Sequence, residues 1–260
     1  MRTKSITLNT KKIYFASDQH FGAPTPEKSL EREKIFVQWL DTVKHDADII
    51  FLLGDLFDFW FEYKHVVPKG YIRLFGKLAE LRDAGIDIRF FVGNHDLWMK
   101  DYFEKELGIP VYHEPKEFTL QGKTFLIGHG DGLGPGDRGY KFIKKIFTNP
   151  VCNWLFKWLH PDLAISFGKY LSLENKTVSG QEDVHFLGED KEYLILYCKE
   201  ILEQKHYDYF VFGHRHLPMI YDLPKNSKYV NTGDWITYFT YGELVNGNFE
   251  IKEYLKSSEA

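Results

Sequence analysis

Short apolar runs alternate with amphipathic stretches along the first hundred residues of the chain. The runs at 12–17, 48–53 and 87–92 are rich in β-branched and aromatic residues and have the length of buried strands. Between them, apolar residues recur at helical spacing over 27–45 and 72–84. Strands that alternate with helices in this way predict a sheet with helices packed on its faces, and therefore an α/β fold.

Shorter strands dominate the second half of the chain. The pattern predicts a hairpin over 116–127, and then a helix followed by a strand over 190–212. The C-terminal part, 229–255, is typical of short strands with a hairpin turn at Asn246-Gly247. The sequence contains neither an internal repeat nor a low-complexity linker, so it predicts one domain spanning 1–260.

One segment, residues 138–180, differs from its surroundings. It contains seven basic and two acidic residues, a local charge of +5, whereas the rest of the chain carries −9 and the whole chain −4. Two prolines divide it, which predicts two or three short helices inserted between core strands. Eight aromatic residues lie within it: Tyr140, Phe142, Phe147, Trp154, Phe156, Trp158, Phe167 and Tyr170.

Composition narrows the class of protein. At 260 residues the chain can bury a core without disulfides, and its two cysteines, Cys152 and Cys198, have no partner at metal-ligand spacing. The net charge of −4 argues against a dedicated nucleic-acid binder. No apolar run approaches the ~20 residues of a membrane span, and residues 1–8 lack the apolar stretch of a signal peptide. We therefore expect a cytoplasmic protein that is soluble or lies on a membrane surface.

The candidate chemistry lies in polar clusters that each follow a predicted strand. Loops at the ends of neighbouring strands converge in an open α/β sheet, so their side chains can meet in one pocket. Asp, Asn and His are ligand types for divalent ions of intermediate hardness, and the pattern therefore predicts a metal site. The clusters are Asp18-x-His20, Gly54-Asp55, Gly93-Asn94-His95-Asp96, Gly128-His129-Gly130-Asp131 and Gly213-His214-x-His216.

In this order the clusters resemble the sequence blocks of the calcineurin-like metallophosphoesterase superfamily. The resemblance implies a four-layer α/β/β/α sandwich with an inserted helical cap, here residues 138–180. It also implies a centre of two divalent ions that clamp phosphoryl oxygens and activate a water molecule. Carried over to this chain, it implies one ion held by Asp18, His20 and His216, a second held by Asn94, His129 and His214, and Asp55 as the bridge between them.

Further roles follow from the same resemblance. His95 would act with Asn94 in catalysis, by donating a hydrogen bond or a proton to the phosphate or to the leaving oxygen. Asp96 and Asp131 would orient their neighbours. Histidine ligands must be neutral at the coordinating nitrogen, so we expect activity to fall on acidification. For Arg215, between the last two histidines, we expect a solvated surface position.

A narrower resemblance covers nearly the whole chain. The motif Gly54-Asp-Leu-Phe-Asp-Phe-Trp60, the block at His129 and the helical insertion are similar to the UDP-2,3-diacylglucosamine diphosphatase family of lipid A biosynthesis. That family, usually with manganese, cleaves the substrate pyrophosphate by water attack on the α-phosphorus, giving UMP and 2,3-diacylglucosamine 1-phosphate. The residues of this chain that match its substrate contacts are Asp137, Ser172, Asn175 and Lys176. One departure is His95, because the best-known branch of the family has Arg there.

The inserted segment fits a lipid substrate on physical grounds. Its aromatic and aliphatic side chains can bury acyl chains at roughly 0.8 kcal/mol per CH₂, and its lysines attract anionic head groups. We therefore expect a lipid-linked UDP-sugar as the substrate and reversible, peripheral binding to the cytosolic face of the inner membrane.

Three alternatives remain open from the sequence. A metallophosphoesterase acting on soluble nucleotides or another small phosphodiester would need no apolar cap. A scaffold that has lost its metals would not need the seven candidate ligands, all of which are present. A nuclease would have to place a polyanion against a chain that is acidic outside 138–180.

Overall fold

The computed structural model describes residues 11–136, 138–179, 186 and 188–255. The helices are α1 (Pro26–Val43), α2 (Ile72–Asp83), α3 (Tyr102–Leu107), α4 (Arg138–Thr148), α5 (Pro150–Phe156), α6 (Pro161–Ser179), α7 (Tyr193–Gln204) and a 3₁₀ turn, η1 (Pro224–Asn226). The strands are β1 (Lys12–Ala16), β2 (Ala47–Leu52), β3 (Asp87–Phe91), β4 (Val111–Tyr112), β5 (Lys116–Leu120), β6 (Lys123–Ile127), β7 (Tyr209–Phe212), β8 (Met219–Leu223), β9 (Ser227–Asn231), β10 (Thr240–Val245) and β11 (Asn248–Glu253).

The strands form two sheets. The first has the order β11-β10-β1-β2-β3-β4, with β1 to β4 parallel and β10 and β11 antiparallel at one edge. The second has the order β5-β6-β7-β9-β8, in which β6, β7 and β9 run parallel. In each sheet the central parallel strands end at one edge, which is where the polar clusters follow them in sequence.

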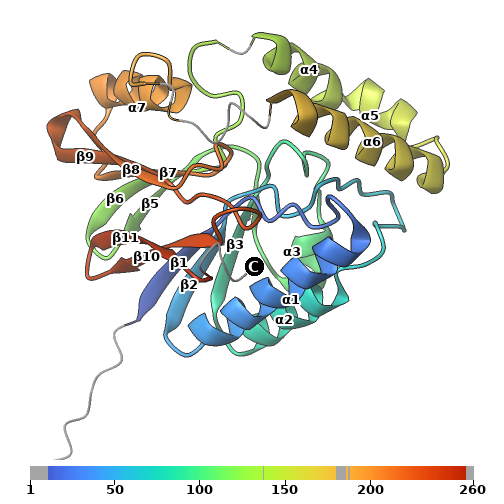
Figure 1. The fold of residues 1–260 in the computed structure, drawn as a ribbon, viewed down its shortest axis with the longest axis horizontal. Helices are drawn as coiled ribbons and strands as arrows, with labels where there is room; N and C mark the ends of the chain where they lie inside the picture. Colours follow the sequence, from blue (N-terminus) through green and yellow to red (C-terminus); the bar gives the residue numbers. More distant parts are fainter. Residues whose placement is uncertain (1–10, 137, 180–185, 187, 256–260) are drawn as a thin grey trace, which may run out of the picture.

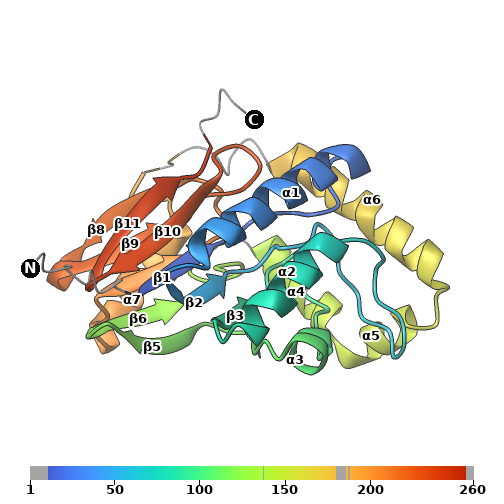
Figure 2. The ribbon, with the colours of Figure 1, turned by 90° about the horizontal axis from the view of Figure 1, so that it is seen from below.

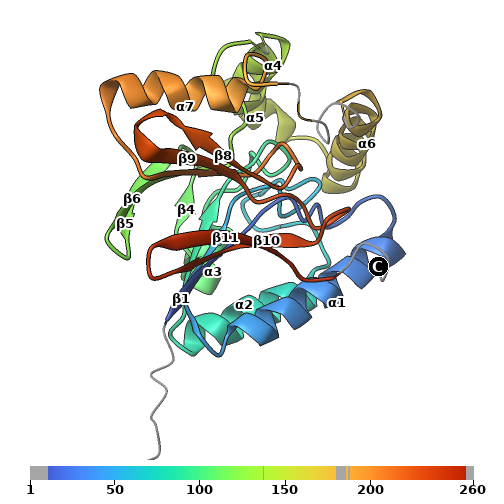
Figure 3. The ribbon, with the colours of Figure 1, turned by 60° about the vertical axis from the view of Figure 1, so that its left-hand side comes forward.

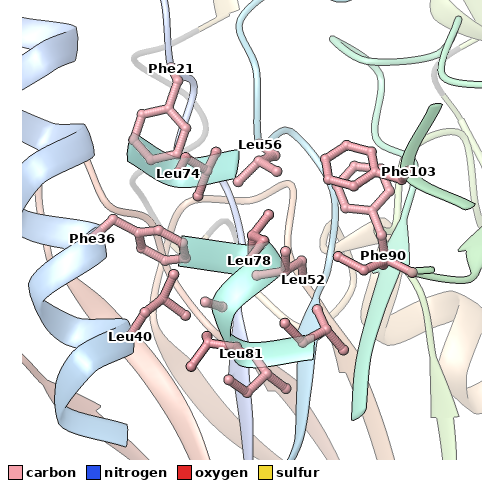
Figure 4. Close-up of a cluster of buried hydrophobic side chains, with 14 of the residues drawn as sticks. Phe21, Phe36, Leu40, Leu52, Leu56, Leu74, Leu78, Leu81, Phe90 and Phe103 are labelled. Atoms are coloured by element: carbon pink, nitrogen blue, oxygen red, sulfur yellow. The ribbon is translucent and has the colours of Figure 1, made fainter. Parts of the chain in front are cut away.

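Helices cover the outer face of each sheet, which gives four layers (Figures 1 and 3). Helices α1 and α2 lie against the first sheet and α7 against the second, as the predicted α/β/β/α sandwich requires. Each interface between layers has its own buried apolar cluster. Figure 4 shows part of the cluster under α1 and α2, where Phe36, Leu40, Leu74 and Leu78 point toward Leu52 of the sheet. The resemblance therefore predicted the fold correctly.

The two sheets are held together by stacked aromatic rings. The Phe15 ring is fully buried and lies 5.0 Å from the Phe51 ring and 4.9 Å from the Phe249 ring, measured between centroids. It also reaches Phe125 of the second sheet at 6.4 Å. Large rings bury much apolar surface at little cost in side-chain entropy, so these residues fix the spacing of the sheets.

Helices α4, α5 and α6, which we call the three-helix segment, lie beside the sandwich at the end where the parallel strands finish (Figures 1 and 2). Trp98, which follows β3, anchors them. Its ring packs against Phe147 at 5.3 Å and Phe156 at 6.0 Å, and its Nε1 donates to the Phe147 carbonyl oxygen at 2.8 Å. The segment is thus attached to the loops that also carry the polar clusters.

The predicted elements up to β3 are correct to within two residues at each end. Four elements were not predicted: β4 has only two residues, α3 has six, η1 has three, and β8 is an edge strand whose side chains are mostly half-buried or exposed. Such elements form because their neighbours supply the packing, and their own apolar pattern is weak. Helix α6 has 19 residues, longer than the short helices we expected.

In the described part of the chain, no helix is both long and apolar enough to cross a membrane. The two cysteines are not paired with each other: Cys152 is exposed, and Cys198 lies on the buried face of α7.

We predict that Phe15→Ala lowers the free energy of unfolding by about 3–5 kcal/mol, because it leaves a cavity between rings that cannot collapse into it. Urea denaturation measures the loss. Val66→Ala, at a side chain that is 47% exposed, is the control and should change the free energy by less than about 0.5 kcal/mol. Equal losses for the two variants would contradict the role given to the aromatic layer.

Candidate metal centre

Seven predicted metal ligands lie together at one end of the sandwich. The segments after β1, β2 and β3 approach from the first sheet, and those after β6 and β7 approach from the second. Residues far apart in sequence therefore meet where the two sheets adjoin. Three groups of side chains lie close enough to share an ion: Asp18, His20 and His216; His20, Asp55 and His95; and Asp55, His129 and His214.

The backbone at this site is strained. Five of the candidate ligands, none of them glycine, have positive φ: Asp18 (58°), His20 (46°), Asp55 (51°), His214 (69°) and His216 (51°). Non-glycine residues seldom adopt this conformation, which costs on the order of 1 kcal/mol or more each. Strain gathered on the same residues that carry the candidate donor atoms indicates that the surrounding structure imposes their positions.

Around Asp18, donor atoms face one another at short range. The Nε2 atoms of His20 and His216 are 3.2 Å apart, and Oδ1 of Asp18 lies 3.3 Å from His216 Nε2 and 3.9 Å from His20 Nε2. Within the described residues, Oδ1 is buried and has no hydrogen-bond partner. A buried carboxylate oxygen normally has such a partner, so this atom is available to a ligand.

Asp55 stands between this group and the next. Its Oδ2 lies 3.6 Å from His20 Nε2 and 3.5 Å from His129 Nε2. On the far side, His129 Nε2 is 3.1 Å from Asn94 Oδ1, and the rings of His129 and His214 are 5.1 Å apart. A carboxylate in this position can reach donor sets on both sides, as a bridging ligand must.

The pKa values of the carboxylates and histidines at this site are shifted in opposite directions, because the two kinds of group stabilise each other's charged form. Burial alone would raise the pKa of Asp55, but the imidazoles of His129, His95 and His20 outweigh it and hold that pKa well below its usual range. In the same way His216 lowers the pKa of Asp18 to about 2 against burial. Burial opposes charge on the imidazoles too, yet Asp55 raises the pKa of His129 to about 10 and Asp18 raises that of His216 to about 10. Without metal, protons therefore supply the charge that a cation could supply.

The second nitrogen of each ring is fixed by its own partner. His129 Nδ1 donates to the Leu53 carbonyl oxygen at 2.7 Å, and His216 Nδ1 lies 3.2 Å from Asp234 Oδ2. Both contacts leave Nε2 facing the site, which is the usual arrangement behind a metal-ligating histidine. Asp234 was not predicted from the sequence. It follows Gly233 after β9, in a Gly-Asp pair like Gly54-Asp55, and this pair was the available signal.

Two further contacts hold the loops in register. Asp96 accepts hydrogen bonds from the backbone N–H groups of Gly93 at 2.6 Å and Leu56 at 2.9 Å, so it orients its neighbours as predicted. A Cβ atom at Gly93 would lie 2.2 Å from Asp55 Oδ1. Only glycine therefore allows the loop after β3 to pass this close to Asp55.

The donor set fits divalent cations. It consists of two buried carboxylates, the half-buried amide oxygen of Asn94 and imidazole nitrogens that face one another. One buried oxygen of Asp18 has no hydrogen-bond partner among the described residues. Oxygen and nitrogen donors without thiolate suit ions of intermediate hardness such as Mn²⁺. The excess of buried carboxylate explains why a cation is favoured here over an empty polar pocket.

The remaining predicted site residues have different outcomes. His95 lies at the site, with Nε2 4.0 Å from Asp55 Oδ2, and Ser172 of α6 lies behind it with its Oγ 2.9 Å from His95 Nδ1. Asn175 and Lys176 belong to α6, but their side chains are outside the described part of the structure, as is the whole of Asp137.

Two other expectations concern charged residues near the site. Asp131 is buried and bound by Lys144 at 2.6 Å and Tyr140 at 2.5 Å, so it attaches α4 to the loop after β6. The expectation of a solvated Arg215 was wrong. Its guanidinium is buried and paired with Glu192 at 3.1 and 3.0 Å, because the segment before α7 covers it.

Comparison with known proteins agrees with this site. The family model described as calcineurin-like phosphoesterase matches residues 11–218. A protein of Porphyromonas gingivalis named UDP-2,3-diacylglucosamine hydrolase is 36% identical to this chain. The similarity covers 95% of this chain and 99% of that protein. Proteins of the same name from Histophilus somni and a Shewanella species are each 25% identical, covering 86% and 85% of this chain and 92% and 88% of their own lengths.

The family model covers most of the chain, including every cluster that supplies a donor atom, and the relative from P. gingivalis is similar over almost its whole length. The chain therefore belongs to the calcineurin-like phosphoesterases and, within them, to the UDP-2,3-diacylglucosamine hydrolases.

Proposed function

We propose that this protein hydrolyses the pyrophosphate bond of UDP-2,3-diacylglucosamine by water attack on the α-phosphorus, which yields UMP and 2,3-diacylglucosamine 1-phosphate. The observation that carries the proposal is the near full-length similarity to a hydrolase of that name in a chain with all seven donor residues in place. The seven are Asp18, His20, Asp55, Asn94, His129, His214 and His216.

We propose that these seven residues hold two divalent ions, with Mn²⁺ as the native metal. Asp18, His20 and His216 would hold one ion, Asn94, His129 and His214 the other, and Asp55 would contact both. When bound, such ions polarise phosphoryl oxygens and lower the pKa of a water molecule. The protein contributes fixed donor positions, since Leu53 and Asp234 orient the rings of His129 and His216.

His95 is placed to exchange a proton with the substrate. The Asp58 carbonyl oxygen, 2.9 Å from His95 Nδ1, can only accept a hydrogen bond, so Nδ1 carries the hydrogen. The other nitrogen, Nε2, faces Asp55 and the donor cluster. We therefore assign to Nε2 of the doubly protonated His95 ring the hydrogen bond or proton given to the phosphate or to the leaving oxygen, because a neutral ring with its hydrogen on Nδ1 has none to give at Nε2. Asn94 lies beside it.

The substrate-side residues remain part of the proposal. Asp137, Asn175 and Lys176 are assigned by their resemblance to substrate contacts of the family. Ser172 carries the same assignment by resemblance, and in the structure its buried hydroxyl contacts Asp58 and His95 from α6.

We further propose that the three-helix segment binds the acyl chains and rests on the cytosolic face of the inner membrane. Its outer surface is apolar: of the 15 large apolar residues exposed in the described structure, 11 lie in its helices or in the turn between α5 and α6. A patch of this kind marks an interaction surface, and exposed tryptophans suit a membrane interface. They are Phe142, Ile143, Ile146, Val151, Trp154, Leu155, Trp158, Leu159, Leu163, Phe167 and Tyr170.

We predict that, with Mn²⁺ in detergent, the protein releases UMP from UDP-2,3-diacylglucosamine faster than from a UDP-sugar without acyl chains. Chromatography of released UMP measures both rates. Asp55→Ala should lower either rate by at least about 100-fold, since it removes the shared ligand. Equal rates on the two substrates would exclude the lipid assignment and favour an enzyme for soluble nucleotides.

We predict that metal binding releases protons. The pKa values of His129 and His216 are raised to about 10 in the metal-free protein, so both rings are protonated at pH 7 and must lose that proton to bind an ion. Affinity for Mn²⁺ should therefore rise with pH, by about tenfold per pH unit for each proton released. Calorimetry at pH 7 in buffers of different ionisation enthalpy counts the protons. An affinity that stays constant from pH 6 to pH 8 would exclude protonated ligands.

We predict that the protein floats with vesicles containing anionic phospholipid and that Trp154→Ser/Trp158→Ser reduces the bound fraction. The two rings are 57% and 73% exposed, so their loss removes apolar surface from the patch without opening a cavity. The control is Ile72→Ser, at a residue 78% exposed on α2, which should bind as the wild type does. A wild-type protein wholly unbound at low salt would count against membrane docking.

A further inference from the structure

Helix α6 approaches the site with a row of small residues. Ala164, Gly168 and Ser172 recur every fourth position and are all buried, whereas Leu163 and Phe167, on an adjacent face of the helix, are 68% and 53% exposed. Residues four apart lie on one helix face. Small side chains at these positions let the helix axis come close to the loop after β2.

The middle position of the row has no space for a larger residue. A Cβ atom at Gly168 would lie 2.1 Å from Cε2 and 2.2 Å from Cζ of the Phe59 ring. That ring cannot easily retreat, because the Trp98 ring packs against it, 5.5 Å away between centroids. Trp98 is itself packed on α4 and α5. Gly168 therefore sets the distance between α6 and the loop.

One turn further along, Ser172 reaches the candidate catalytic histidine. Its Oγ donates to Asp58 Oδ2 at 2.9 Å and lies 2.9 Å from His95 Nδ1. Since Nδ1 already carries the hydrogen that points at the Asp58 carbonyl oxygen, Ser172 Oγ is an acceptor for that same hydrogen. The hydroxyl therefore holds Asp58 and the His95 ring together from the side of α6.

We propose that the row Ala164-Gly168-Ser172 is a positioning device, in which Gly168 sets the approach of α6 and Ser172 then fixes the orientation of the His95 ring. The inference rests on the role proposed above for His95. It adds Gly168, which has no polar side chain to contribute to chemistry, to the residues on which the rate depends. A ring displaced by a fraction of an ångström delivers its proton less well.

The first test compares two glycine-to-alanine changes. Gly168→Ala should lower kcat at saturating Mn²⁺ by about 10- to 100-fold, the range expected for a misplaced reacting group. Adding Phe59→Leu should restore most of the loss, because it makes room for the methyl group. Gly76→Ala in α2 is the matched control: a methyl group there would meet no neighbouring atom within 4 Å, so kcat should be unchanged. A Gly168→Ala protein as active as the control would overturn the proposal.

The second test separates positioning from substrate contact. Ser172→Ala should lower kcat with KM unchanged, and should have no further effect in a His95→Ala background, since its effect passes through His95. A rise in KM that persists in the His95→Ala background would instead show that Ser172 acts on the substrate directly and would overturn the positioning role. Circular dichroism melts establish that each variant is folded.

A third measurement does not depend on turnover. In the metal-free protein, the ¹⁵N resonances of His95 should show hydrogen on Nδ1, and Ser172→Ala and Gly168→Ala should shift them toward those of a free imidazole. Unshifted resonances in both variants would contradict the inference. If the wild type cleaves bis(p-nitrophenyl) phosphate and leaves UDP-2,3-diacylglucosamine intact, the proposed function fails, while the same comparisons of variants on that diester still decide the role of α6.

Discussion

The structure at the active end is organised around two buried carboxylates, Asp18 and Asp55. Neither has a lysine or arginine partner among the described residues. Imidazoles face both carboxylates, and Asp18 and Asp55 each also accept one backbone hydrogen bond, from the N–H groups of His214 and His95 respectively. Buried anions without counter-charge are unstable. In the metal-free protein the imidazoles provide that charge as cations, as the high pKa values of His129 and His216 show. When divalent ions bind, they would supply the positive charge instead, and the imidazoles would then be neutral.

Holding these groups together costs backbone strain, which the sandwich must offset. Five candidate ligands occupy left-handed conformations at strand ends, and none could stay there if the strands moved. The ring layer of Phe15, Phe51 and Phe249 fixes the strands that carry Asp18 and Asp55. These three buried rings therefore help to keep the metal centre rigid.

The sequence predicted the donor residues because their chemistry is local. Each follows an apolar strand, and the ends of parallel strands meet, so Asp18, Asp55 and His129 could be brought together without knowledge of the fold. The layer order came from a family resemblance instead. The predictions that failed concern contacts between distant segments. Arg215 was expected to be solvated because the residues next to it in the sequence give no sign that Glu192 pairs with it.

Asp58 and Asp234 were missed for the same reason. Their importance comes from which atom of a histidine they approach, and spacing along the chain does not encode this. Gly168 was missed as well. In the sequence it is a residue of low helix propensity, and the position of the Phe59 ring explains why a glycine is needed there. Long-range steric constraints of this kind leave no periodic signal.

Helix α6 carries two kinds of surface at adjacent positions. Gly168 and Ser172 contact the loop after β2, while Leu163, Phe167 and Tyr170 are exposed and apolar. Because a helix is rigid over this length, an acyl chain or a membrane that bound the exposed residues would act on the same body that holds His95. The same helix would then bind the lipid and hold the His95 ring. Lipid binding would restrict the motion of that ring without contacting it. A soluble phosphodiester, which offers nothing to the apolar face, would not have this effect.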